Sequence, residues 1–250
     1  GTATGKTTTL NCLSMFIRPD AKVVSIEETA ELNLPHENWI ASISRPSFGV
    51  GGGPAEISLF DLLKAALRQR PDYIIVGEVR GAEAYTLFQA MATGHGGLSS
   101  IHADTVEGMI NRLETEPMNI PRALIPTLDM VAVMTRTRIG GRPVRKLELA
   151  SEIANPKRNP GELSVENVFN WDPAADLFSS TGRSGLIEKI KQRRGIAQDV
   201  VDTELARRQT ILEWMVKSKI RRYKDVARII RDYNNDPAGT FDRARLGLLH

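Results

Sequence analysis

The chain opens on the residues Gly1-Thr2-Ala3-Thr4-Gly5-Lys6-Thr7-Thr8. This run matches the Walker A pattern G-x-x-x-x-G-K-[ST] except for its leading glycine, which would lie ahead of Gly1. In such a loop, backbone N–H groups and the lysine contact phosphate oxygens, and the Ser or Thr hydroxyl ligates Mg²⁺. We expect a nucleotide-binding loop, with Thr7 as a magnesium ligand, formed by Thr2, Ala3, Thr4, Gly5, Lys6, Thr7 and Thr8. The competing interpretation is a plain Gly-Lys turn at the start of a helix.

The pattern also predicts a fragment, because the buried strand that feeds a Walker A loop is missing from the sequence. After the loop, apolar strand-like runs alternate with segments of helical periodicity. This alternation predicts an α/β fold with a mainly parallel sheet. The expected strands are 21–26, 72–79 and 98–103, the expected helices are 8–16, 58–70, 84–93 and 106–116, and residues 35–56 are expected to form a loop.

The second half of the chain follows a different pattern. Residues 130–138 and 143–153 flank Gly140-Gly141, which predicts a β-hairpin. We divide the chain into a core, 1–154, a linker rich in Pro, Asn and charge, 155–162, and a C-terminal region, 163–250. That last region is expected to contain one strand, 163–171, followed by helices from Gly185 onward.

The composition is that of an ordinary globular chain: 250 residues, 41% hydrophobic, with a net charge of +3. The single cysteine, Cys12, indicates a reducing compartment, and no apolar run is long enough to span a bilayer. Charge is uneven, since residues 183–232 carry 14 Lys or Arg against 7 Asp or Glu. This basic region would suit an anionic membrane, an acidic partner or nucleic acid, or would be only a solvated helical surface.

Acidic residues follow two of the predicted strands. Glu78 ends the apolar run Tyr73-Ile74-Ile75-Val76-Gly77, as a Walker B acid does, and would hold Mg²⁺ through a water or orient the attacking water. Glu27 and Glu28 end an earlier strand, and side chains of adjacent strand residues point to opposite faces. We therefore expect only one, Glu27, to face the nucleotide and act on the attacking water.

His95 and His102 bracket the third strand, where a histidine can donate a hydrogen bond to a γ-phosphate or occupy a satisfied core position. Arg45, Arg68 and Arg80 are candidates to stabilise phosphoryl transfer from a neighbouring subunit. Each arginine could instead form a surface salt bridge. The sequence does not rank the three.

With these elements in order, the chain resembles the type II and type IV secretion and type IV pilus motor ATPases. Their Walker A, Asp box, Walker B and His box elements correspond here to 1–8, 25–29, 74–80 and 94–103, and the segments 65–81 and 112–114 are also similar. Within that superfamily, the hairpin and the tail segment Ile211-Leu212-Glu213-Trp214-Met215 resemble the archaeal archaellum and pilus branch.

The resemblance implies a RecA-like P-loop ATPase core with a β-hairpin and a C-terminal helical region, which binds ATP and Mg²⁺. It implies a homohexamer on the cytoplasmic face of the membrane, docked on a polytopic platform protein and closed by an N-terminal domain absent here. It also implies that Glu27 is the catalytic glutamate, that Arg45 and Arg68 are candidate arginine fingers, and that His95 and His102 belong to the site. The expected activity is ATP hydrolysis that powers filament assembly or secretion.

Two features depart from the family pattern. Glu28 stands where the Asp box usually has Asp, and the loop at 49–54 is longer than usual. Two alternatives stay open: a DNA-transfer motor of the same superfamily, and a non-enzymatic remnant. Nucleic acid is the less favoured partner because basic and aromatic residues are not interleaved. The transported substrate, the direction of the motor, and the activity of this chain alone are not determined by the sequence.

Overall fold

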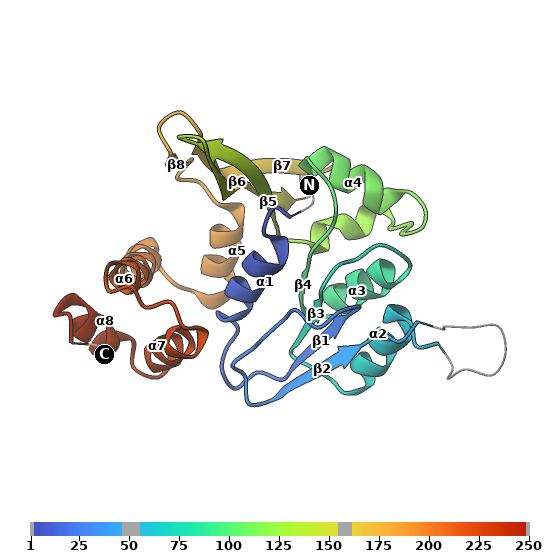
Figure 1. Ribbon diagram of the computed structural model, residues 1–250, viewed down its shortest axis with the longest axis horizontal. Coiled ribbons are helices and arrows are strands. Elements are labelled where there is room, and N and C mark those ends of the chain that lie inside the picture. The colour runs from blue at the N-terminus through green and yellow to red at the C-terminus, as the bar shows by residue number, and fades with distance from the viewer. Residues whose placement is uncertain (1–2, 47–55, 155–161, 249–250) are drawn as a thin grey trace.

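A parallel sheet forms the centre of the first half of the chain (Figure 1). The computed structural model describes residues 3–46, 56–154 and 162–248. The sheet order is β2-β1-β3-β4, with β1 at Val23–Glu27, β2 at Trp39–Ile43, β3 at Tyr73–Val76 and β4 at Gly96–Ser99. The register pairs Ile26 with Val76 and Val76 with Ser99, so three neighbouring strands end at the same edge.

Helices cover both faces of this sheet, as expected for a parallel sheet. Leu10 of α1 (Lys6–Ser14) packs with Val23 and Ile75 on one face. Val24 and Ile74, which point the other way, pack with helices α2 (Leu59–Arg68), α3 (Glu83–Ala92) and α4 (Val106–Glu114). The alternation along each strand therefore creates two apolar layers, and the α/β fold predicted from the sequence is confirmed.

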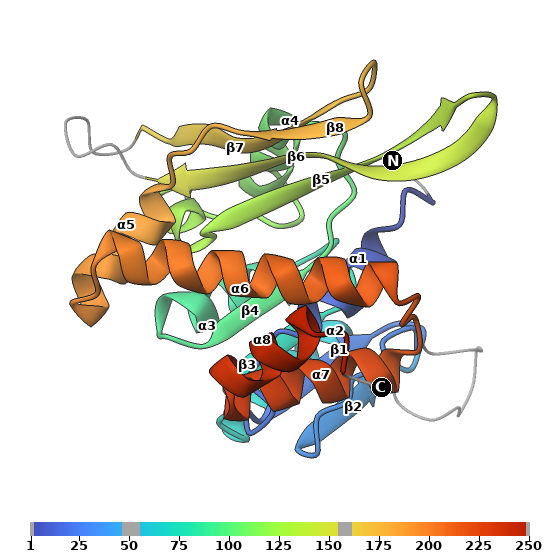
Figure 2. The same ribbon diagram turned by 90° about the vertical axis from the view of Figure 1, so that its left-hand side faces the viewer.

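A second, antiparallel sheet follows a short 3₁₀ helix, η1 (Arg122–Thr127), and lies beside α1 in Figures 1 and 2. Its order is β5-β6-β7-β8. The hairpin turn is at Gly140 and Gly141, whose φ angles of 55° and 77° lie in the left-handed region that glycine tolerates. The strands are β5 (Met130–Ile139), β6 (Arg142–Ala154), β7 (Ser164–Asp172) and β8 (Leu177–Ser180).

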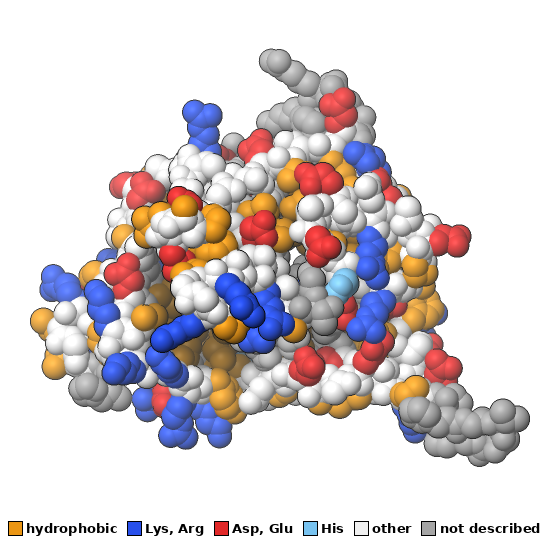
Figure 3. All heavy atoms as spheres, turned by 45° about the horizontal axis from the view of Figure 1, so that its top comes forward, with side chains coloured by type: hydrophobic (Ala, Val, Ile, Leu, Met, Phe, Trp, Pro, Cys, Tyr) orange, Lys and Arg blue, Asp and Glu red, His pale blue; other side chains and the backbone are white. Residues whose placement is uncertain are grey.

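The C-terminal helices form a small apolar cluster of their own. Trp214 and Met215 of α6 pack with Ile229 and Tyr233 of α7 and with Ala244 of α8. Lys and Arg side chains gather toward this end of the molecule in Figure 3. The helices are α5 (Gly185–Arg194), α6 (Gln198–Lys217), α7 (Tyr223–Asn235) and α8 (Pro237–Arg245). None of the described helices is long and apolar enough to cross a membrane.

Several expectations need correction. Residues 35–56 are not all loop, because Trp39–Ile43 forms edge strand β2. The strand was missed because the prolines and glycines of this segment favour a loop, although Trp39–Ile43 is mostly apolar. The strand expected at 98–103 begins earlier, at Gly96, and β8 and α8 were not predicted. The loop at 49–54 and most of the expected linker, 155–161, lie outside the described residues.

The predicted domain boundary at 155–162 falls within one sheet. Strand β7 pairs with β6 in antiparallel register from Leu149↔Asn170 to Ala154↔Ser164. Buried Glu152 of β6 also accepts hydrogen bonds from the Ser184 hydroxyl and the Leu186 backbone N–H at the start of α5. The first helix of the C-terminal region is thus attached directly to the hairpin sheet.

An apolar groove of about 470 Å³ separates the two sheets. It is lined by Leu10 and Leu13 of α1, Leu98 of β4, and Met130 and Met134 of β5. Among the described strands, β4 and β5 are both edge strands of their sheets. The groove therefore lies between two strand edges, one of β4 and one of β5, that pair with no other described strand.

The parallel sheet depends on tight packing at β3. We expect Ile74→Ala to lower the free energy of unfolding by about 2–5 kcal/mol, because Ile74 is completely buried and truncation leaves a cavity. Chemical denaturation measures this change. Val216→Ala is the matched control, since Val216 is 77% exposed and its truncation should cost less than about 0.5 kcal/mol. Equal losses in the two variants would contradict the described core.

Candidate active site

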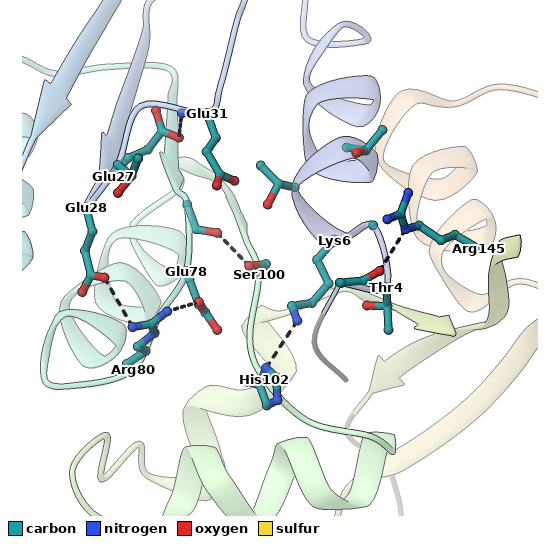
Figure 4. A pocket seen from close by; sticks show the side chains of 16 residues that line it. Thr4, Lys6, Glu27, Glu28, Glu31, Glu78, Arg80, Ser100, His102 and Arg145 are labelled. Atoms are coloured by element: carbon teal, nitrogen blue, oxygen red, sulfur yellow. Dashed lines mark hydrogen bonds and ion pairs between the residues drawn. The ribbon is translucent and has the colours of Figure 1, made fainter. Parts of the chain in front are cut away.

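A cavity of about 620 Å³ opens at the carboxyl edge of the parallel sheet (Figure 4). Residues from the first loop, from the ends of β1 and β3, from the segment after β4, and from the hairpin sheet line it. The lining residues are Ala3, Thr4, Gly5, Lys6, Thr7, Thr8, Glu27, Glu28, Thr29, Glu31, Gly77, Glu78, Arg80, Ser100, His102 and Arg145.

The first loop has the conformation that a phosphate cradle requires. Gly5 is the N-cap of α1 and has a φ of 95°, which a residue with a Cβ rarely adopts. Its carbonyl accepts the Thr9 backbone N–H at 2.9 Å, so α1 starts directly at Lys6. The first N–H groups of a helix and its dipole favour an anion at this point. Six of the seven loop residues predicted to bind nucleotide line the cavity, whereas Thr2 lies outside the described residues.

Lys6 faces the segment that follows β4. Its Nζ lies 3.4 Å from Nδ1 of His102. The Arg112 side chain donates a hydrogen bond to the His102 carbonyl at 2.7 Å, which holds this segment beside α4. The Ser100 hydroxyl donates to the Gly77 carbonyl at 2.7 Å and joins the ends of β4 and β3. His102 and Lys6 are therefore brought together from positions far apart in the sequence.

Glu27 is a buried carboxylate held by the backbone. Its Oε1 accepts the backbone N–H groups of Glu31 and Leu32, each at 3.0 Å. Only 5% of the residue is exposed. A Cβ at position 77 would lie 3.2 Å from Glu27 Cγ, so glycine at that position permits the close approach of the two strand ends. The fixed carboxylate lines the cavity opposite Lys6.

Glu78 and Glu28 are bridged by Arg80 in Figure 4. Arg80 donates to Glu78 Oε2 at 2.5 Å and to Glu28 Oε2 at 3.3 Å. The hydrogen bond from Arg80 to Glu78 and the charge of Glu78, with a smaller effect of Glu28, raise the pKa of Arg80 above its ordinary value. Arg80 therefore remains cationic and holds the two carboxylates at the cavity wall.

Three predicted site residues lie elsewhere in this chain. His95 precedes β4, at the opposite end of the strand from the cavity, and its Nδ1 lies 3.2 Å from the Ala90 carbonyl. His95 thus lies where the chain turns between α3 and β4 and does not line the cavity of its own chain. Its contact with nucleotide stays a prediction. Arg68 ends α2, and Arg45 lies beyond β2, where its backbone pairs with Ile57. Neither arginine lines the cavity.

Two residues were missed from the sequence. Arg145 of β6 lines the cavity and donates its Nε–H to the Ala3 carbonyl at 2.9 Å. Glu83, 7% exposed, accepts the backbone N–H groups of Arg80 and Gly81 at 2.7 and 2.8 Å and shapes the loop after β3. A sequence signal for Glu83 exists, because acidic residues are enriched in the first turn of a helix. No local pattern marks Arg145, because its approach depends on how the two sheets pack.

The donor set suits magnesium. Mg²⁺ prefers oxygen ligands and is usually bound through one or two carboxylates together with substrate phosphates. Here the Thr7 hydroxyl and the Glu78 carboxylate line the same cavity. These residues would hold the ion, which would neutralise phosphate charge.

The comparisons with known proteins agree with this geometry. Residues 1–232 match the family described as type II/IV secretion system protein. The chain belongs to this family.

Its relatives come from archaea and bacteria. The uncharacterized protein MJ1287 of Methanocaldococcus jannaschii is 47% identical over 217 residues, which cover 87% of this chain and 80% of that protein. The putative conjugal transfer protein Rv3659c of Mycobacterium tuberculosis is 33% identical over 175 residues, which cover 69% of this chain and 49% of that protein.

A solved structure supports the same family. The VirB11 ATPase of the Brucella suis type IV secretion system, crystallised with sulphate, aligns with a TM-score of 0.51 and 27% identity. The alignment covers 61% of this chain and 46% of VirB11. The chain thus spans about half the length of VirB11 and of the mycobacterial relative.

The Glu27 carboxylate should stabilise the fold through one oxygen. We expect Glu27→Ala to lower the free energy of unfolding by about 1–3 kcal/mol, since it leaves the Glu31 and Leu32 N–H groups without an acceptor. Glu27→Gln keeps an accepting oxygen and should retain most of that stability. Urea denaturation measures both variants. An equal loss of unfolding free energy in the two variants would show that the carboxylate does not stabilise the fold through these backbone hydrogen bonds.

Proposed function

We propose that this chain is the nucleotide-binding core of a motor ATPase that powers secretion or filament assembly. The observation that carries the proposal is the single cavity that brings Lys6, Glu27, Glu78 and His102 together. These residues come from four separate segments of the sequence, and each is of a type that can act in phosphoryl transfer to water. Membership of the secretion family supports the assignment independently.

Each residue would have a distinct role. The N–H groups at the start of α1 and the Lys6 ammonium would bind the β- and γ-phosphates of ATP. Thr7 and Glu78 would hold Mg²⁺. Glu27 has one oxygen fixed by the backbone, and its second oxygen, which has no hydrogen-bond partner among the described residues, would orient the attacking water. His102, beside Lys6, would contact the γ-phosphate and respond to its loss.

The finer assignment concerns the assembly. We favour a motor for archaellum or type IV pilus-like filaments, supported by the archaeal relative and by the helical tail. The motor would be a hexamer at the cytoplasmic face of the membrane, docked on a platform protein and closed over ATP by an N-terminal domain. Arg45 and Arg68, which lie outside the cavity of their own chain, would reach the nucleotide of the next subunit.

A DNA-transfer motor is the second candidate. It is supported by the likeness to a putative conjugal transfer protein and by the basic region 183–232. Single-stranded DNA binding that weakens steeply as salt concentration rises would favour this candidate. If the chain does not bind single-stranded DNA even at low salt, the DNA-transfer motor is excluded and the protein-transport motor is left.

Removal of the Lys6 ammonium should weaken nucleotide binding. We expect Lys6→Ala to weaken ATP affinity about ten- to hundredfold, since a charge-assisted contact to phosphate is lost. Isothermal titration calorimetry of the chain measures the affinity. Lys217→Ala, which removes the same ammonium from a side chain that is 80% exposed on α6, should bind as the parent does. Unchanged binding by Lys6→Ala would refute the phosphate cradle.

Glu27→Gln should separate binding from hydrolysis. The amide keeps the fold but cannot accept a proton, so we expect turnover to fall about a hundred- to ten-thousandfold while ATP affinity is retained. Phosphate release by the longest natural polypeptide that carries this sequence measures the turnover. Undiminished turnover would remove Glu27 from the mechanism. A parent protein that binds ATP without any turnover would support the non-enzymatic alternative.

A further inference from the structure

Arg145 reaches the first loop from the antiparallel sheet. It lies in β6, opposite Arg136 of β5, and its Nε–H donates to the Ala3 carbonyl at 2.9 Å. Its aliphatic stem lies over the turn of the loop, since a Cβ at Gly5 would be only 3.2 Å from Arg145 Cδ. The side chain is exposed and lines the cavity together with Lys6. Arg145 thus belongs to the wall of the cavity, although it comes from a different sheet.

The cavity offers another arginine, but its charge is already engaged. Arg80 is shared between Glu78 and Glu28, which offset its positive charge. In contrast, no carboxylate among the described residues pairs with Arg145. Its only described hydrogen bond uses Nε, so the terminal nitrogens of the planar guanidinium remain as donors. An arginine held by one nitrogen and open at the others is suited to bind a phosphate oxygen pair.

We propose that Arg145 binds the phosphates of the nucleotide within its own subunit. This inference rests on the nucleotide site proposed above. Nε would support the loop through Ala3 while the terminal nitrogens contact the phosphate chain from the side opposite Glu27 and Glu78. The phosphates would then be held between the parallel sheet and the hairpin sheet. Nucleotide binding would in this way fix the position of β6, and through Glu152 that of α5.

The test measures binding of ADP and of inorganic pyrophosphate by calorimetry. We expect Arg145→Gln to weaken both about ten- to hundredfold, because the contact is to phosphate and not to the base. Arg145→Lys should fall between Arg145→Gln and the parent, since an ammonium keeps the charge but cannot contact Ala3 and phosphate at once. The lysine variant also decides the question if the glutamine variant is unstable.

The matched control is Arg142→Gln, which removes an exposed arginine of the same strand that does not line the cavity. It should bind within about twofold of the parent. Loss of a direct phosphate contact should also flatten the decline of pyrophosphate affinity with rising salt, whereas loss of loop support alone would leave that slope unchanged.

The outcomes separate the two proposals. If Arg145→Gln binds like Arg142→Gln, or weakens binding without changing the salt slope, the assignment of Arg145 is wrong. If Lys6→Ala loses binding in the same experiment, the nucleotide site itself stands. If Lys6→Ala also binds like the parent, the nucleotide site and the role of Arg145 are both overturned.

Discussion

Parallel pairing of β1, β3 and β4 in one register is the constraint on which the site depends. Because parallel strands all point the same way, Glu27, Glu78 and His102 leave the sheet at one edge. The register places Glu27 next to Gly77, where any side chain would approach Glu27 closely. The Ser100–Gly77 hydrogen bond continues this pairing past the last residues of the strands. A shift of one strand by a residue would separate these groups from Lys6.

Much of the site could be predicted because short sequence patterns mark its parts. Such patterns mark the Gly5-Lys6-Thr7 turn and the apolar run that ends in Glu78. The two glycines of the hairpin in the second sheet form a third pattern. Strand β2 was missed although Trp39–Ile43 is mostly apolar, because the prolines and glycines on either side of it favour a loop. His95 precedes β4 and so lies at the opposite end of that strand from the cavity, although the sequence grouped it with His102. Arg145 was missed because its position arises only from packing between sheets.

The second sheet gives the core an additional physical function. It supplies Arg145 to the wall of the cavity and, through buried Glu152, holds the start of α5. One strand, β6, therefore connects the loop that would bind phosphate with the helical region. The exposed ion pair between Lys189 of α5 and Asp129 contributes little to stability, so the buried Glu152 contacts are the stronger coupling between these parts.

A structure of the chain determined with bound ADP tests the central claim most directly. We predict that the diphosphate lies against the start of α1, within hydrogen-bonding distance of Lys6 Nζ, with Glu27, Glu78 and His102 around it. A nucleotide found instead in the apolar groove between β4 and β5, or with its phosphates directed away from Lys6, would contradict the account.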